Sequence, residues 1–484
     1  MSLLENAKWN AFSQSFKIIV QLINIVYLAR IIPPSEYGLM AMALVIINFG
    51  ILLRDLGTAA AIIQRETLTS RLINTVFWLN TLMGVTIGIA VIAISSPIAS
   101  IYEQPKLFSV LCLLSIIFPL SSCASAHQAL LERESKFKKI SMVEVTSSLF
   151  SVCIAIVLAN MGYGVYSLVF QAIVMSLMSA CQYWIVSVWR PSIKEFISIA
   201  ELKSIFGFSA NLSLFNFINY FSRNTDSFII GKYMSVAILG SYSLAYRIML
   251  FPLQSLTFVA TRSLYPVLSK NQNDNKEIAK TYLNCIFAVL LITMPLMSGI
   301  ALLSQPFVNL VFGSQWWLTA DILTWLAPTA IIQSVLSTTG SVFMAKGRTD
   351  ILMRLGVVGT ILQVGAFFVG ANYTIIIFAK MYFFANIINF FPVMFFLLKL
   401  IDSNFSAFFK KVSPIFISSF AMIVILKIII EFFILDIKNQ SAISLALTSC
   451  LGAIFYFLSM FVFSKAIRNF SKKIFKTFCF SSSQ

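Results

Sequence analysis

Polar side chains recur at helical spacing in two otherwise apolar stretches of the sequence. In the first stretch the spacing is four, three, four and three residues, so one helix face carries them all: Asn10, Gln14, Lys17, Gln21 and Asn24. The second stretch shows a similar pattern: Ser209, Ser213, Asn216, Asn219, Arg223 and Asp226. Amide, hydroxyl and basic groups bind sugar hydroxyls and anions. Both faces are therefore predicted to bind a polar, anionic ligand.

Basic residues supply the charge for such a site. Five of them stand inside apolar stretches. Lys427 is taken as an interfacial or structural residue, which leaves four: Lys17, Arg223, Arg247 and Lys380. A guanidinium can hold two phosphate oxygens at once, and a cationic surface attracts anions. The predicted substrate-binding set is these four residues together with the neighbouring amides Gln21, Asn24, Asn216 and Asn219.

Two of these assignments have structural alternatives. Asp226 is the one clear acid in the same stretches, and it could pair with Arg223 three residues earlier in a purely structural role. Lys17 stands early in its stretch, and its ammonium could instead extend to water at the membrane edge.

Groups for covalent or metal chemistry are scarce. The chain has one histidine, His127, and seven widely separated cysteines without metal-ligand spacing. It also lacks a phosphate-binding glycine loop of the ATPase type. We therefore expect no catalytic residue, no metal and no cofactor, and we do not expect an enzyme. His127 is expected to be solvated or hydrogen-bonded near the end of a membrane span.

The composition indicates how these residues are positioned. Of 484 residues, 59% are hydrophobic and 11% are charged, whereas soluble proteins carry about 25% charged residues. This predicts an all-α polytopic membrane protein with about 14 transmembrane helices, the first of them retained rather than cleaved. The predicted spans are 9–32, 38–56, 73–95, 107–127, 141–160, 164–187, 206–230, 236–260, 280–303, 317–344, 351–370, 374–398, 413–433 and 442–463.

The distribution of basic residues predicts the orientation. Of the 35 Lys and Arg residues, 26 fall on one side if the N-terminus is cytoplasmic, and four fall on the other. Cytoplasmic loops carry the excess of basic residues, so both termini are predicted to be cytoplasmic. This rule also accounts for most of the net charge of +17, so no nucleic-acid partner is expected.

An internal repeat predicts the domain organisation. Residues 28–43 align with 230–245 at an offset of 202, which pairs Arg30 with Lys232 and Gly38 with Gly240. Each half then has six spans, so the two bundles are parallel and related by a pseudo-two-fold axis along the membrane normal. The predicted domains are 1–190 and 191–400, followed at 401–484 by a C-terminal helix pair and a basic cytoplasmic tail.

The repeat also places the two polar faces at equivalent positions. A charge at the bilayer centre costs about 2.5–3.5 kcal/mol, so these faces are not expected to contact lipid. We predict that they border a hydrophilic, positively charged cavity between the two halves.

Several short motifs follow one another in a familiar order. They are residues 34–38 (PSEYG), 54–64, 128–137, 208–211, 223–226, 239–247 and 345–350. With these motifs the chain resembles the Wzx-type O-antigen and exopolysaccharide flippases of the MOP (multidrug/oligosaccharidyl-lipid/polysaccharide) superfamily. The resemblance covers nearly the whole chain.

The resemblance implies a function. Such flippases use two six-helix bundles around a V-shaped cavity to move an undecaprenyl-diphosphate-linked oligosaccharide from the cytoplasmic to the periplasmic leaflet of the bacterial inner membrane. It implies alternating access and coupling to a proton or sodium gradient, for which Asp226 is the candidate residue. It also implies contact of Arg223, Arg247, Lys17 and Lys380 with the diphosphate or acidic sugars. Membrane lipid, a polysaccharide polymerase and a chain-length regulator are the implied partners.

Two other functions remain open at this point. A multidrug-type exporter of the same superfamily is the main alternative, although its cationic cargo would favour an acidic cavity. A membrane-embedded glycosyltransferase or polymerase would need catalytic groups in larger loops, and the loops here are short and poor in acids.

Overall fold

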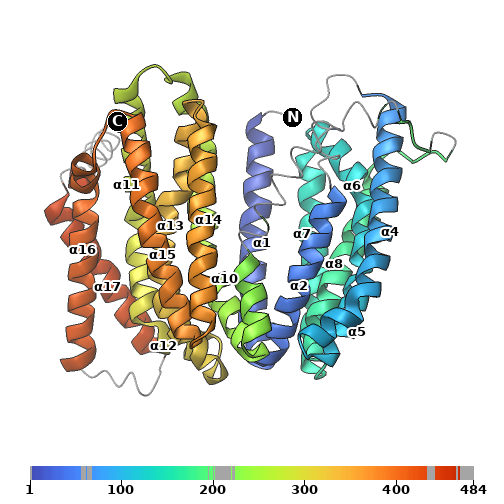
Figure 1. Cartoon of the computed structure of the whole chain (residues 1–484), viewed down its shortest axis with the longest axis horizontal. Helices are drawn as coiled ribbons and strands as arrows, with labels where there is room; N and C mark the ends of the chain where they lie inside the picture. The colour runs from blue at the N-terminus through green and yellow to red at the C-terminus, as the bar shows by residue number, and fades with distance from the viewer. Residues whose placement is uncertain are drawn as a thin grey trace, which may run out of the picture. The chain divides into compact units, whose positions relative to one another are not determined.

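The computed structural model describes residues 3–55, 62, 68–193, 196–199, 201, 220, 224–432, 442–464 and 467–468 (Figure 1). All regular secondary structure among these residues is helical, and no strand occurs among them. The chain forms two compact units, Met1–Ser243 and Leu244–Gln484. The predicted domain boundaries at 190/191 and 400/401 remain predictions.

The first unit is a bundle of antiparallel and parallel helices. Its helices are α1 (Leu3–Ile31), α2 (Pro34–Asp55), α4 (Ser70–Ile101), α5 (Pro105–Leu114), α6 (Ile117–Arg133), α7 (Phe137–Asn160) and α8 (Val165–Val186). Within it α7 packs against both α1 and α8, and α6 packs against α4 and α8. This arrangement brings α1 next to helices that follow it by more than 100 residues.

The second unit is also helical. It contains most of α10 (Val236–Lys270), then α11 (Asn275–Leu302), α12 (Ser304–Val311), the short 3-10 helix η1 (Ser314–Trp316), α13 (Trp317–Ala345), α14 (Thr349–Ala371), α15 (Ile375–Leu400), α16 (Phe405–Phe432) and α17 (Ala442–Phe463). Here α13 packs on α11 and α15, and α14 packs on α15. The C-terminal pair α16–α17 packs against α11, where the Tyr456 hydroxyl donates to the Leu291 carbonyl at 2.9 Å.

Among the described residues, eleven helical segments are long and apolar enough to cross a membrane. They coincide with the predicted spans 2 to 6 and 9 to 14. The first and eighth predicted spans lie in α1 and α10, and most of the seventh, 206–230, lies outside the described residues. The chain is thus an all-α, multi-pass membrane protein, while the total of fourteen spans and the orientation of the termini remain predictions.

The fourth predicted span, 107–127, differs from the structure because it is interrupted. Two helices, α5 and α6, occupy this segment, and they meet at Ser115 and Ile116. Pro119 explains the break, since a proline lacks an N–H donor and its ring clashes with the carbonyl four residues earlier, here that of Ser115.

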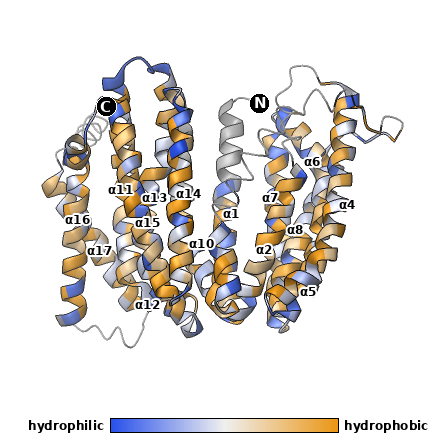
Figure 2. Cartoon of the chain, in the orientation of Figure 1, coloured by the Kyte–Doolittle hydropathy of each residue, from blue (hydrophilic) through white to orange (hydrophobic). Residues whose placement is uncertain are grey.

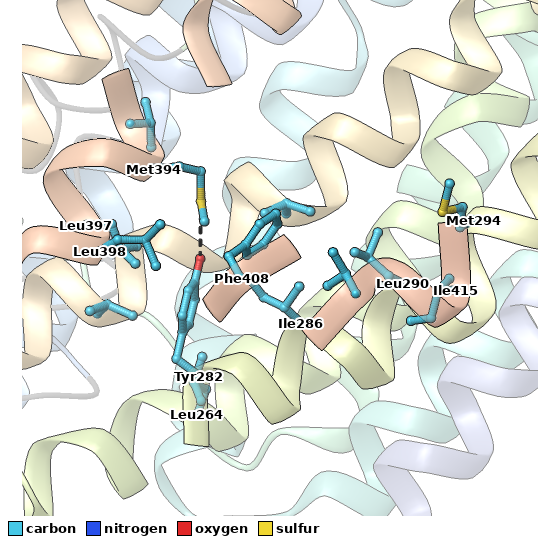
Figure 3. Packing of buried hydrophobic residues seen from close by; sticks show 14 of the residues in the cluster. Leu264, Tyr282, Ile286, Leu290, Met294, Met394, Leu397, Leu398, Phe408 and Ile415 are labelled. Carbon is cyan, nitrogen blue, oxygen red and sulfur yellow. Dashed lines mark hydrogen bonds between the residues drawn. The ribbon is translucent and has the colours of Figure 1, made fainter. Parts of the chain in front are cut away.

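The core of the second unit joins its central helices to α16. Tyr282 of α11 is fully buried, and its hydroxyl donates to the Met394 sulfur of α15 at 3.8 Å (Figure 3). Phe408 and Ile415 of α16 pack into the same cluster. On the outside, apolar residues cover most of the length of α14 and α16 (Figure 2), and Phe420 and Met353 are each 68% exposed. Such surfaces suit contact with lipid.

Two glycines allow a close helix contact in the first unit. A Cβ atom at Gly38 of α2 would overlap the backbone of Val236, and one at Gly240 would overlap the backbone of Pro34. These positions are paired by the 202-residue repeat, since 34 corresponds to 236 and 38 to 240. The contact is therefore reciprocal, as a pseudo-two-fold axis would require at this point.

Candidate functional site

The polar face of α1 makes its main contact through an ion pair. The Lys17 ammonium lies 2.6 Å from a carboxylate oxygen of Glu144 on α7. The two side chains are 24% and 28% exposed, so the pair is partly open to its surroundings. Lys17 therefore does not simply extend to the membrane edge, because its charge is met by a carboxylate from a neighbouring helix.

The rest of this face is divided between bonded and exposed groups. Asn24 is buried and donates through Nδ2 to Oε1 of Gln171 on α8 at 3.3 Å. Its own amide oxygen makes no hydrogen bond within the described residues. By contrast, Gln14 and Gln21 are exposed. Lys17 and Asn24 thus hold α1 against its own bundle, Gln14 and Gln21 are exposed, and the side chain of Asn10 lies outside the described ones.

Further polar contacts continue this layer along α7 and α8. The Thr146 hydroxyl donates to Oε1 of Gln182 at 2.7 Å, and the Gln182 amide donates to Ser147 at 3.3 Å. Towards the end of α1, the Asn160 amide donates to the Tyr27 hydroxyl at 3.0 Å. Together with Lys17–Glu144 and Asn24–Gln171, these bonds form what we call the first polar layer.

Most of the second predicted stripe is not described. Asn216, Asn219 and Arg223 lie outside the described residues, so the predicted pairing of Arg223 with Asp226 stays a prediction. Asp226 itself is buried, and it accepts hydrogen bonds from the Tyr242 hydroxyl at 2.8 Å and from the Ser227 amide at 2.6 Å. Both of these donors are neutral, and no cation pairs with the carboxylate among the residues that the structure describes.

The second unit carries its own group of polar side chains, which we call the second polar layer. The Lys380 ammonium of α15 lies 5.0 Å from the ring centroid of Trp325 on α13. The Gln333 amide of α13 donates to the Tyr382 hydroxyl and, at 3.4 Å, to Oδ1 of Asn386. The Asn386 amide in turn donates to the Tyr382 carbonyl at 2.8 Å.

Arg247, the remaining predicted cation, lies on α10. Its side chain is exposed, and no ion pair with it is found among the described residues. The structure thus brings Lys17 together with Asn24 in one unit. It places Lys380 and Arg247 in the other, on different helices.

Sequence reasoning missed Glu144, and the view of Asp226 as the one clear acid within the spans was wrong. Glu144 lies inside the apolar helix Phe137–Asn160, where it is the one charged residue of the stretch 140–160, and this was an available signal. Trp325 and Asn386 were also missed. The spacing of Tyr382, Asn386 and Asn389, which puts three polar groups on one face of α15, could have revealed that layer.

The expectation for His127 was wrong as well. The residue is fully buried, and neither ring nitrogen makes a hydrogen bond with the described residues. Its ring lies 4.7 Å from Trp184 and 5.3 Å from Trp189, measured between centroids. The histidine therefore packs as an aromatic residue. The described residues also contain no group of acidic, His and Cys side chains that could hold a metal ion.

Comparison with known proteins decides the family. The model of the family described as "Polysaccharide biosynthesis protein" matches residues 27–321. The chain belongs to this family. The resemblance to polysaccharide flippases that the sequence motifs indicated is therefore confirmed.

Individual relatives agree with this placement. The chain is 27% identical over 451 residues to the teichuronic acid biosynthesis protein TuaB of Bacillus subtilis, covering 92% of this chain and 93% of the relative. It is 29% identical over 375 residues to the lipopolysaccharide biosynthesis protein WzxC of Escherichia coli, covering 76% and 75%.

A solved structure agrees in fold. The lipid II flippase MurJ, in an inward closed conformation, matches with a TM-score of 0.72 and 16% identity, over 94% of this chain and 99% of that one. This polysaccharide biosynthesis protein therefore has the fold of a membrane flippase.

Proposed function

We propose that this polysaccharide biosynthesis protein is a flippase for an undecaprenyl-diphosphate-linked oligosaccharide, such as an O-antigen, capsule or exopolysaccharide repeat unit. It moves this substrate by alternating access from the cytoplasmic to the periplasmic leaflet of the bacterial inner membrane. Family membership and the flippase fold support transport of a lipid-linked glycan. The oligosaccharide would then be available to a polymerase and a chain-length regulator.

The observation that carries the proposal is the presence of a basic residue, together with amides, inside apolar helices of each unit. Lys380 is half-buried in α15, a helix long and apolar enough to cross a membrane, and Lys17 is half-buried in α1, where the first span is predicted. Intramembrane charges mark substrate or ion pathways, because they are costly elsewhere. Ammonium and guanidinium groups suit the diphosphate, and amides suit sugar hydroxyls.

The carboxylates suit a gradient-driven step. Asp226 is buried and bonded to neutral donors, so a proton or sodium ion could bind there without breaking an ion pair with a described residue. We keep Asp226 as the ion-coupling residue of this proposal. Replacement by Asn should leave substrate binding intact and abolish the dependence of export on the gradient.

Surface glycan production tests the proposal. A strain lacking this protein should make no surface polymer and should accumulate lipid-linked repeat units inside, and the wild-type chain should restore export. Arg223→Ala and Arg247→Ala should insert into the membrane but fail to restore it. Lys276→Ala, which changes an exposed residue at the start of α11, is the matched control.

Two outcomes would contradict the flippase. Normal surface polymer in the strain without the protein would remove it from the pathway. Loss of resistance to cationic drugs in that strain, with polymer unchanged, would instead support a multidrug-type exporter.

A further inference from the structure

We propose that Glu144 is a displaceable internal counter-anion of Lys17. It holds the ammonium when the site is empty, yields it to the diphosphate when substrate arrives, and helps to expel the substrate afterwards. The proposal rests on the proposed function, and it adds a specificity-determining and release-determining residue to that site.

The position of the ion pair sets it apart from surface pairs. It joins α1 and α7, whose residues are separated by 127 positions, inside their helical lengths. The other ion pairs given for the described residues lie at or beside helix ends: Lys106–Glu36, Lys136–Glu134, Lys280–Glu277 and Arg348–Asp350. A pair within membrane helices costs desolvation energy, so a bracing role alone gives little reason for it.

Accessibility is the second observation. Both side chains remain about a quarter exposed, and the exposed Gln21 follows Lys17 by one helical turn on the same face of α1. A ligand can therefore reach the ammonium without unpacking α1 from α7. The charged partner of Glu144 is Lys17 of α1. The buried Tyr183 of α8 interacts electrostatically with Glu144 and with Glu132 of α6.

Electrostatics then determines the exchange. A diphosphate carries more negative charge than one carboxylate, so it can compete for Lys17 where the surroundings screen charge poorly. Once it binds, Glu144 loses its partner and faces a like charge nearby. This repulsion lowers the affinity for the bound anion. A transport site benefits from such a limit, because its cargo must leave as well as enter.

The exchange predicts that one substitution raises the affinity for the diphosphate, although most substitutions in a binding site lower it. Removing the charge of Glu144 eliminates both the competitor and the repulsion, so Glu144→Gln should bind the diphosphate about tenfold more tightly or better. Lys17→Gln should bind it more weakly. The double variant should bind no more tightly than Lys17→Gln, because the gain requires the ammonium.

Binding of farnesyl diphosphate to the full-length protein in lipid nanodiscs, followed by calorimetry, measures these effects. Farnesol, which has the same prenyl chain without the charge, should bind all variants equally. Glu277→Gln, which neutralises an exposed carboxylate paired with Lys280, controls for the loss of one negative charge. Glu144→Met gives a second neutral variant in case the glutamine variant does not fold.

A structural brace would give the opposite result. In that case Glu144→Gln and Lys17→Gln would lower the melting temperature to a similar degree, and neither would tighten farnesyl diphosphate binding. Unchanged or weakened binding by Glu144→Gln therefore overturns the proposal. So does the absence of any farnesyl diphosphate binding by the wild type and both neutral variants of Glu144.

Export in cells separates this inference from the function it rests on. If the wild-type chain restores surface glycan but Glu144→Gln does not tighten binding, the flippase stands and the counter-anion exchange fails. If Glu144→Gln tightens binding but the wild-type chain supports no glycan export, the exchange stands and the proposed flippase fails.

Discussion

The two polar layers hold their lysines by different interactions. In the first layer a carboxylate 2.6 Å away cancels the charge of Lys17, whereas in the second layer the π face of Trp325 attracts Lys380 without cancelling its charge. The first layer is therefore close to neutral until Glu144 is displaced. The second keeps a positive charge at all times. An anion should sense Lys380 more strongly than Lys17 in the empty protein.

The two layers also differ in the membrane face near which their charged residues are predicted to lie. Glu144 follows the start of α7 by about 10 Å, and Lys380 follows the start of α15 by about 8 Å. Under the predicted orientation α7 begins at the cytoplasmic face and α15 at the periplasmic face. In the proposed function Lys17, paired with Glu144, would then meet the substrate on entry, and Lys380 would meet it on the way out.

The largest effect that follows from this comparison belongs to Lys380. Lys380→Gln should weaken diphosphate binding about tenfold to a hundredfold, as expected for a hydrogen bond between charged groups worth about 1.5–3 kcal/mol. Calorimetry with farnesyl diphosphate measures the change. Lys380→Arg should retain most of the affinity. A neutral variant that binds as well as the wild type would remove the contrast between the layers.

A smaller effect is expected from Trp325, which positions the ammonium. Trp325→Ala removes a cation–π contact worth about 0.5–2 kcal/mol, so diphosphate affinity should fall a few-fold, while Trp325→Phe should lose less. The salt dependence of binding should stay as in the wild type, since the charge remains. If Trp325→Ala changed the salt dependence as strongly as Lys380→Gln, the indole would be doing more than positioning.

The amides of the second layer should matter for stability rather than for binding. Asn386 is fully buried and links Gln333 with the Tyr382 carbonyl. Asn386→Ala removes these two hydrogen bonds, while Gln333 keeps its bond to the Tyr382 hydroxyl, so the free energy of unfolding should fall by about 0.5–1.5 kcal/mol. The melting temperature in detergent reports the loss. A variant as stable as the wild type would show that water replaces the amide.

The smallest effect is expected from Asn24 in the first layer. It makes a single long hydrogen bond, and its amide oxygen has no partner within the described residues. Replacing it by Leu removes a polar group that is half unsatisfied, so stability should change by less than about 1 kcal/mol. A melting temperature much lower than that of Asn386→Ala would reverse the ranking of the two layers.

Periodicity located the helices because lipid imposes a long apolar run on each of them. It could not locate the partners of the polar residues. Lys17 and Glu144 are 127 residues apart, and Lys380 and Trp325 are 55 apart, so no local spacing relates either pair. The same holds for His127, whose aromatic neighbours Trp184 and Trp189 lie in α8 and just after it.

Some features were readable from single residues. Pro119 could have predicted the break between α5 and α6, because its effect on the preceding carbonyl is local. Glu36, in the motif 34–38, shows the opposite case. Its carboxylate accepts from the Val165 amide at the start of α8 at 2.9 Å and pairs with Lys106 of α5 at 2.9 Å. Only the fold reveals that this residue ties three helices together.

The reciprocal contact of Gly38 and Gly240 has the form of an interface between two identical molecules. Each half of the repeat offers the same small patch, a proline or valine at one position and a glycine four residues later, and receives the other's patch in return. Neither glycine can therefore be exchanged for a larger residue without straining both sides of the crossing at once.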